Sequence, residues 1–199
     1  MPVDADAARP LVAAVAAWSG AREPRVAASL VLLGYSARLL GPVLAVWVRD
    51  GLLVDVRPGE VLHRFAPDTG LRLALRHATG RPAPVPDGAG TLHDEVLAGH
   101  LAPVVAAVRS AAPVAAGLLW GNVASSLAGS LAAIARAGLA TPQRCHEAGQ
   151  ALLRTPLLRG TGVLTLAASD RLTFTRRSCC LYYRLDGGGL CGDCPLVRS

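Results

Sequence analysis

The sequence predicts an α+β protein that is mostly helical, with a minor β component and a cysteine-bearing C-terminal tail. Three observations support this fold class. Long stretches in both halves are almost continuously apolar, with small residues inserted, as in helices packed on several sides. Residues 51–76 instead show short alternating stretches separated by turn signals. Residues 175–199 contain four of the five cysteines.

The first elements expected are two apolar helices, over residues 7–19 and 24–48. Gly41-Pro42 is expected to break or kink the second helix, because proline lacks the backbone donor that a helix interior needs. Short strands should follow in residues 51–76, where Pro-Gly and Asp-Thr-Gly mark the turns. The stretch LRLALR in this region alternates apolar residues with arginine, as a half-exposed strand does.

Helices return after about Leu92, and Pro103 and Pro113 should divide residues 92–137 into two or three of them. Thr141 as N-cap and Pro142 as first helical residue predict another helix, ending near Arg154. The stretch GVLTLAASDRLTFTRRSCCLYYRL is rich in β-branched and aromatic residues around a Ser-Asp turn, and should be extended.

Four regions follow from this reading. Residues 1–79 form an N-terminal α+β region, which is a candidate for substrate binding. Residues 80–90, GRPAPVPDGAG, lack periodicity and are expected to be a linker. Residues 91–174 form a helical core with short strands, and residues 175–199 form the metal-binding tail.

The composition favours a folded protein that does not bind nucleic acid. The chain is 52% hydrophobic and 17% charged, which is enough apolar material for a core. Its formal charge is +6, and all twenty basic residues are arginine. These arginines are scattered, with no basic stripe of the kind that nucleic-acid-binding proteins carry.

The expected location is the cytoplasm. The opening residues MPVDADAARP include two aspartates and lack the cationic start of a secretory signal. Residues 110–135 are uncharged and long enough to span a bilayer. Asn122, Pro113 and several serines and glycines dilute this segment, which favours a buried central helix. Peripheral contact with the inner face of the membrane stays open.

The tail cysteines occur as an adjacent pair, Cys179-Cys180, and as a C-x2-C pair, Cys191 and Cys194. Zinc, disulfides and an iron–sulfur cluster are the competing readings. A reducing compartment disfavours disulfides, and structural zinc sites usually draw on two short-spaced pairs. A [2Fe–2S] cluster presents two irons that each need two thiolates. The x2 pair can hold one iron and the adjacent pair the other, with the glycines at 187–189 close to the inorganic sulfide.

The C-C-x10-C-x2-C arrangement, with RRSCCLYYRL and CGDCPL around it, resembles the C-terminal signature of the FhuF-like ferric-siderophore reductases. The stretch LLWGNVASSLAG, residues 118–129, also resembles a segment of that family. The resemblance implies a [2Fe–2S] cluster on Cys179, Cys180, Cys191 and Cys194. It also implies reduction of iron(III) held by hydroxamate siderophores, with Fe(II) released in the bacterial cytoplasm.

The substrate is expected on a face formed by the loop of residues 181–190 and the helix around Trp120. Asn122 is costly to bury without hydrogen bonds, and it either ties its helix to the cluster loop or faces the substrate. Arg176 and Arg177 either offset the charge of the cluster or lie on the surface. The candidate substrate-binding residues are Trp120, Asn122, Arg176, Arg177, Tyr182, Tyr183 and Arg184.

No side chain beyond the cluster is expected to be catalytic. The sequence has no dinucleotide fingerprint, so a ferredoxin-like protein or a flavin reductase should supply the electron. Cys145 is expected to be a buried structural cysteine. Two alternatives stay open. One is a non-catalytic [2Fe–2S] protein that binds siderophores or senses iron or redox state. The other is a zinc-stabilised interaction module.

Overall fold

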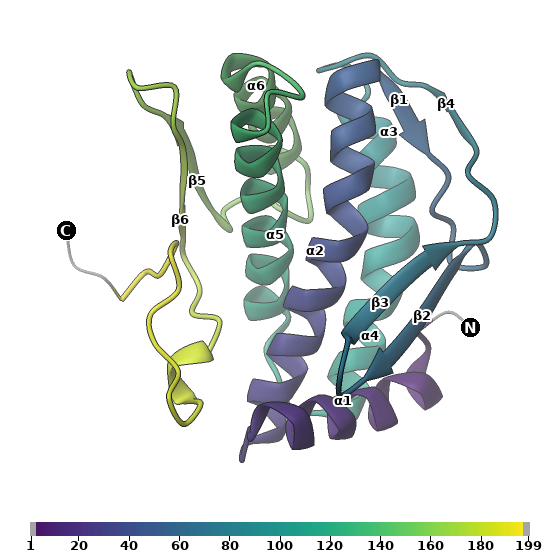
Figure 1. Ribbon diagram of the computed structural model, residues 1–199, viewed down its shortest axis with the longest axis vertical. Helices are drawn as coiled ribbons and strands as arrows, with labels where there is room; N and C mark the ends of the chain where they lie inside the picture. The colour runs from purple at the N-terminus through teal and green to yellow at the C-terminus, as the bar shows by residue number, and fades with distance from the viewer. Residues whose placement is uncertain (1–2, 197–199) are drawn as a thin grey trace.

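The long helices form the body of the molecule, as Figure 1 shows in the computed structural model, which describes residues 3–196. Residues 1–2 of the expected N-terminal region and 197–199 of the expected tail lie outside the described residues. The helices are α1 (Ala5–Ser19), α2 (Pro24–Asp50), α3 (Ala89–Leu92), the π-helix η1 (His93–Leu101), α4 (Ala102–Ala111), α5 (Ala116–Arg136) and α6 (Pro142–Leu153). The mostly helical α+β prediction is therefore confirmed.

Helix α2 runs without a break through Pro42. Of the break or kink expected at Gly41-Pro42, the break is therefore wrong. A proline inside a helix removes one backbone hydrogen bond and costs roughly 3 kcal/mol. Leu40, Val43 and Leu44 are buried around it. Because burying each such side chain contributes about 1.5–3 kcal/mol, packing outweighs the local penalty.

Two helix boundaries follow the sequence signals closely. The Oγ1 atom of Thr141 accepts a hydrogen bond from the Arg144 amide at 3.2 Å, and Pro142 is the first residue of α6, as expected. Pro113 separates α4 from α5, also as expected. Pro103 ends no helix, because it lies in the first turn of α4, where a proline lacks only a donor that would be unpaired anyway.

The strands form three separate antiparallel pairs. They are β1 (Leu52–Val54) with β4 (Gly80–Pro82), β2 (Val61–Ala66) with β3 (Gly70–Leu75), and β5 (Gly162–Leu166) with β6 (Leu172–Arg176). The strands predicted in residues 51–76 and the extended segments at 162–166 and 172–176 are thus confirmed. The prediction of extended structure through Leu185 is wrong for Tyr182–Arg184, which form one turn of 3-10 helix. The first three residues of the expected linker 80–90 are held in β4, where Leu53 pairs with Arg81.

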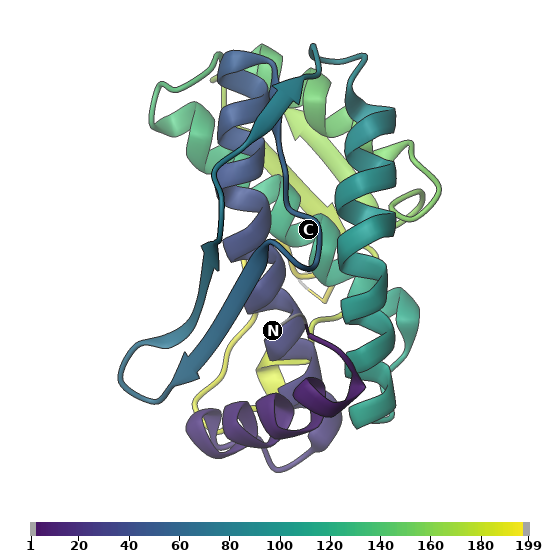
Figure 2. The same cartoon turned by 90° about the vertical axis from the view of Figure 1, so that its right-hand side faces the viewer.

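Helices α2 and α5 pack along each other and form the centre of the fold (Figure 1). The β5–β6 hairpin and the tail lie on one side of this pair, while α4 and the β2–β3 hairpin lie on the other. Helix α1 crosses the end of the bundle, as the turned view in Figure 2 shows. The tail therefore packs on the helical body, beside the contact between α2 and α5.

Within residues 3–196, two helices, α2 and α5, are long and apolar enough to cross a membrane by length and composition. Somewhat more than half of the most apolar 18-residue stretch of each helix is buried inside the protein. Core helices of soluble proteins share these properties. Of the segment 110–135, which was expected to be one buried central helix, residues 116–135 lie in α5, whereas 110–111 end α4 and 112–115 connect the two helices.

Candidate metal centre

The four tail cysteines follow strand β6 and surround a short irregular loop. Cys180 and Cys194 are buried, whereas Cys179 and Cys191 are partly exposed, and all four are free thiols. The connecting loop, residues 181–190, contains one turn of 3-10 helix, η2 (Tyr182–Arg184). Gly188 is required there, because a Cβ atom at this position would lie 2.3 Å from the Tyr182 carbonyl oxygen. The loop therefore folds tightly back on itself and returns the chain to the C-x2-C pair.

The two cysteine pairs meet through one sulfur contact. The Sγ atoms of Cys180 and Cys191 are 3.5 Å apart. Two thiolates on one tetrahedral ion are separated by about 3.8 Å when the metal–sulfur bonds are about 2.3 Å. The contact therefore joins one cysteine of the adjacent pair to one cysteine of the C-x2-C pair. Among residues 3–196, no three His, Cys, Asp or Glu side chains gather as ligands of a single ion.

Backbone amides point at the other two sulfurs. The Leu181 amide lies 3.3 Å from Cys179 Sγ, and the Leu196 amide lies 3.4 Å from Cys194 Sγ. Leu181 adopts a left-handed backbone conformation, with φ at 65°. Such strain in a non-glycine residue costs of order 1–3 kcal/mol and concentrates at functional sites. Amide donors to thiolate sulfur are the interactions that tune metal–thiolate centres.

Burial is the main influence on the Cys191 thiol. It raises the pKa of Cys191, with further contributions from the Asp193 carboxylate and the Cys180 thiol. A raised pKa favours the neutral thiol of Cys191 in the metal-free protein, so metal binding at this residue must release its proton. Burial likewise raises the pKa of Cys145, which is fully enclosed in α6. Cys145 is thus a structural cysteine, in line with the sequence expectation.

A buried hydrogen-bond chain connects the site to both central helices. Ser29 of α2 donates its hydroxyl to the Cys180 carbonyl at 2.6 Å. The Asn122 amide of α5 donates to the Ser29 carbonyl at 2.9 Å and to the Ser29 hydroxyl at 2.8 Å. Arg176 donates to the Asn122 side-chain oxygen at 2.5 Å. The ligand segment is therefore fixed to the α2–α5 contact through Cys180.

The C-x2-C segment is fixed to the same elements through Asp193. The Arg176 amide donates to the Asp193 carbonyl at 3.2 Å, which joins the end of β6 to this segment. The Ser125 hydroxyl of α5 donates to the Asp193 carboxylate. Both halves of the cysteine motif are thus held by α5.

Two ion pairs connect the loop to the turn between α1 and α2. Arg184 pairs with Glu23 at 2.5 Å, and Arg22 pairs with Asp186 at 2.7 Å. The Arg184 hydrogen bond is the main reason that the pKa of Glu23 lies below its usual value. Arg184 also lies over the Tyr183 ring, 5.9 Å from its centroid.

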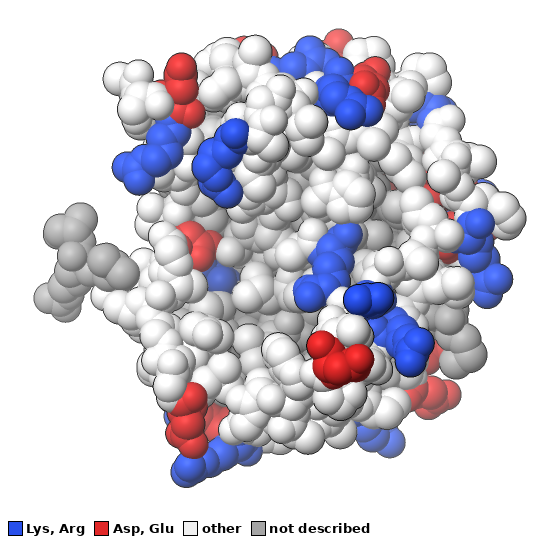
Figure 3. Space-filling model, viewed as in Figure 1, with Lys and Arg blue, Asp and Glu red and all other residues white. Residues whose placement is uncertain are grey.

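A cavity of about 740 Å³ adjoins the cysteine loop. Its walls come from α1, α2, the β2–β3 hairpin and the loop itself, which contributes Tyr182, Leu185 and the 186–188 turn. Figure 3 shows this face hollowed at its centre, with mostly uncharged side chains inside the hollow. The volume lies in the range of about 300–1,000 Å³ that is typical of small-molecule sites.

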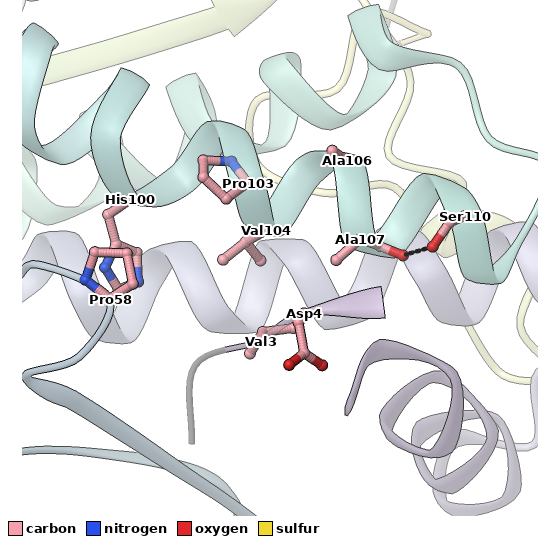
Figure 4. Close-up of a pocket in the computed structure, with 9 residues that line it drawn as sticks. All are labelled: Val3, Asp4, Pro58, His100, Pro103, Val104, Ala106, Ala107 and Ser110. Atoms are coloured by element: carbon pink, nitrogen blue, oxygen red, sulfur yellow. Dashed lines mark hydrogen bonds between the residues drawn. The ribbon is translucent and has the colours of Figure 1, made fainter. Parts of the chain in front are cut away.

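A second cavity, of about 400 Å³, lies far from the cysteines along the chain (Figure 4). Val3, Asp4, Pro58 and His100 line it together with α4 residues such as Val104. None of its lining residues belongs to the cysteine segment. It is therefore a natural reference site for experiments on the first cavity.

The structure separates the seven candidate substrate residues into two groups. Asn122 and Arg176 are buried, with 0% and 1% of their surface exposed, so a substrate cannot touch them in this conformation. Asn122 instead ties α5 to the cysteine segment, which is one of the two roles expected for it. Trp120 is partly buried and packs against the core. The remaining four are exposed: Arg177, Tyr182, Tyr183 and Arg184.

Of these four, Tyr182 lines the cavity of about 740 Å³. Three other features were missed by sequence reasoning. They are Ser29, the Arg22-Glu23 turn, and the contribution of the β2–β3 hairpin to the cavity. A serine inside the otherwise apolar stretch VAASLVLL was the available signal for Ser29.

Comparison with known families agrees with this geometry. Residues 176–196 match the FhuF 2Fe-2S C-terminal domain, which defines the tail as an iron–sulfur domain. Residues 29–178 match the family described as ferric iron reductase FhuF-like transporter. Because this match covers most of the chain, the protein belongs to the FhuF-like family, and its cofactor is a [2Fe–2S] cluster. No curated protein matches the chain.

The residues present fit such a cluster. The four free thiols would supply two ligands for each of the two irons. Arg176 Nε and Ser178 Oγ are buried without a hydrogen-bond partner, and both lie in the segment that leads into Cys179. Donors of this kind are suited to the sulfur acceptors of an anionic centre.

Proposed function

We propose that the protein is a one-electron reductase of ferric siderophores of the hydroxamate type, which releases Fe(II) in the cytoplasm. The observation that carries this proposal is the shared wall between the loop of residues 181–190 and the cavity of about 740 Å³. The family description supports a ferric iron reductase. The substrate class is our proposal.

The bound cluster supplies one electron at a time to the ferric ion, which needs no acid or base from the protein. Hydroxamate oxygens are hard ligands that favour Fe(III), so reduction loosens their hold on the metal. The ferric ion is here the substrate. The task of the protein is to hold the ferric complex close to the cysteine loop for long enough to be reduced.

The cavity walls are suited to this task. Leu30, Phe65 and Leu71 supply apolar surface on the side of the helices and the hairpin. Tyr182 of the loop supplies a ring that can cover an organic ligand backbone. A ferric complex seated between these walls would lie against the loop that connects Cys180 to Cys191. Close approach of this kind is what electron transfer without covalent chemistry requires.

The electron donor is proposed to be a ferredoxin-like protein or a flavin reductase, because the sequence lacks a dinucleotide fingerprint. Cys179 and Cys191 are partly exposed, which leaves a side of the site open to such a partner. We propose a cytoplasmic location, with peripheral contact to the inner face of the membrane. Nucleic acid is not a proposed partner.

Two matched substitutions test the substrate site. Ala37 of α2 lines the cavity beside the loop, and Ala106 of α4 lines the second cavity; both are exposed alanines. Ala37→Phe should raise the KM for a ferric trihydroxamate severalfold, because the added ring occupies the cavity. Ala106→Phe should leave KM unchanged. Initial rates are measured anaerobically with a ferrous chelator, a chemical reductant and protein of verified cluster content.

Equal effects of the two substitutions would place the substrate elsewhere. Binding of the ferric complex without any turnover would favour the alternative of a siderophore-binding or sensing protein. Cys194→Ser, which lacks one ligand, provides the baseline without an intact cluster.

A further inference from the structure

Arg176 carries a positive charge into the interior of the protein. Only 1% of its surface is exposed, which makes it one of the largest fully buried side chains among residues 3–196. Its guanidinium donates one hydrogen bond, to the neutral side-chain oxygen of Asn122. Its Nε atom is buried without any partner.

No carboxylate among the described residues lies within ion-pair distance of Arg176. A buried cation without an opposite charge is strongly unfavourable, and proteins almost always pair such a group. The backbone carbonyl of Asp193 accepts a hydrogen bond from the Arg176 backbone amide. Its carboxylate accepts a hydrogen bond from the Ser125 hydroxyl and makes no ion pair with the Arg176 guanidinium. Residues 3–196 therefore supply no ion-pair partner for this charge.

The location of Arg176 indicates what compensates it. Three hydrogen bonds in series lead from its guanidinium through Asn122 and Ser29 to the Cys180 carbonyl. Its backbone amide is bonded to residue 193, between the other two cysteines. Four thiolates bring negative charges that the iron–sulfide core offsets only in part. The cluster is therefore the concentrated negative charge to which this network connects Arg176.

We infer that Arg176 is the buried counter-charge of the cluster and raises its reduction potential. Reduction adds one electron and makes the cluster one unit more negative. A fixed positive charge close by favours that reduced state more than the oxidised one, most strongly in a desolvated site. Arg176 is thus a positioning and electrostatic residue, not a substrate ligand. The inference depends on the cluster and not on the siderophore, so its failure would leave the reductase proposal standing.

The test compares four proteins by spectroelectrochemical titration of the cluster. Arg176→Met removes the charge and keeps an unbranched side chain of similar length. Arg176→Lys keeps the charge. Arg177→Met makes the same change at the exposed neighbouring arginine. The visible spectrum and the iron and sulfide content establish that each variant carries a cluster before its midpoint potential is measured.

Arg176→Met should shift the midpoint potential of the cluster by at least about 59 mV to a more negative value. For a one-electron step, this shift corresponds to a tenfold change in the equilibrium constant for reduction by a fixed donor. Arg176→Lys and Arg177→Met should stay near the wild-type potential. If Arg176→Met assembles no cluster while Arg176→Lys does, the result also supports the inference, because it shows that the cluster needs a positive charge at this position. An unchanged potential in Arg176→Met overturns the inference, and so does loss of the cluster in both Arg176 variants.

A second measurement uses the metal-free protein. Without the cluster, the buried cation has no counter-charge, so Arg176→Met should unfold at a higher urea concentration than wild type when both lack metal. The order should reverse, or the difference should vanish, when both carry the cluster. A lower urea midpoint for metal-free Arg176→Met would contradict the inference, because it would show that the guanidinium stabilises the fold without the cluster.

Discussion

At the scale of single residues, one glycine determines whether the cysteine segment can lie on the helical body. A Cβ atom at Gly121 of α5 would be 2.0 Å from Ser178 Oγ and 3.1 Å from an Arg176 guanidinium nitrogen. Both neighbours belong to the segment that leads into Cys179. The absence of a side chain at this position therefore allows the close approach on which the network of Ser29, Asn122 and Arg176 depends.

Gly121→Ala is predicted to weaken the site. The added methyl group must displace Ser178 and crowd Arg176, and overpacking of this kind costs typically 1–3 kcal/mol. Gly129→Ala on the same helix is the matched control, because its Cβ atom meets nothing within 4 Å and the residue is exposed. The control should gain up to about 1 kcal/mol of helix stability.

Urea unfolding and iron content of the two purified variants measure this difference. A Gly121→Ala protein with the stability and cluster content of Gly129→Ala would show that the contact at Gly121 is not limiting.

Single residues also show which parts of the site could be predicted from the sequence and which could not. The four cysteines were identifiable because their spacing is local. Asn122 was expected to need partners because a buried amide is costly. Ser29 was not found, because its bond to Cys180 joins positions far apart in the chain. A contact of that range follows only from the packing of α2 against the tail.

At the scale of helices and strands, local sequence signals again predicted the structure well, whereas features that depend on tertiary packing were not predicted. Helix α6 begins where its local capping signals predict, and the β2–β3 hairpin follows its Asp-Thr-Gly turn. The expected break at Gly41-Pro42 failed because burial on both sides of Pro42 outweighs a local penalty. The cavity beside the loop could not be predicted, since its walls come from four elements separated in sequence.

A buried histidine joins helices η1 and α2 to the segment that follows β1. His100 of η1 approaches the Val56 carbonyl through Nδ1 at 2.5 Å and the Tyr35 hydroxyl of α2 through Nε2 at 2.7 Å. A carbonyl can only accept, so Nδ1 carries the proton and Nε2 accepts from Tyr35. Burial lowers the pKa of His100, against an opposing contribution from its bond to Val56.

This arrangement predicts a loss of stability in mild acid. His100 has a lowered pKa in the folded state, so its contribution is fully present above its ordinary pKa of 6.5. Below that value the unfolded chain takes up a proton that the folded protein resists, and stability falls. The slope for one proton is at most about 1.4 kcal/mol per pH unit.

Urea unfolding at pH 7.5 and at pH 5.5 checks this prediction. His100→Gln keeps polar atoms but cannot titrate, so it should lose less stability than wild type over the same interval. Equal losses in the two proteins would show that His100 does not contribute to the acid sensitivity.

At the scale of the whole molecule, a helical body, a hairpin and a cysteine tail enclose one cavity beside one redox centre. The α2–α5 contact positions the cysteines through Ser29, Asn122 and Ser125. The outer ion pairs of Arg184 and Asp186 hold the loop against the turn between α1 and α2. The substrate region expected in the N-terminal half and the tail thus contribute facing walls to the same cavity.

The most direct measurement of the central claim is a single turnover. Protein reduced anaerobically by one electron per cluster is mixed with a ferric trihydroxamate and a ferrous chelator in a stopped-flow instrument. The account predicts that the visible absorption of the oxidised cluster returns while one Fe(II) per cluster is trapped, and that both signals rise together. A cluster that stays reduced in the presence of excess ferric complex would contradict it.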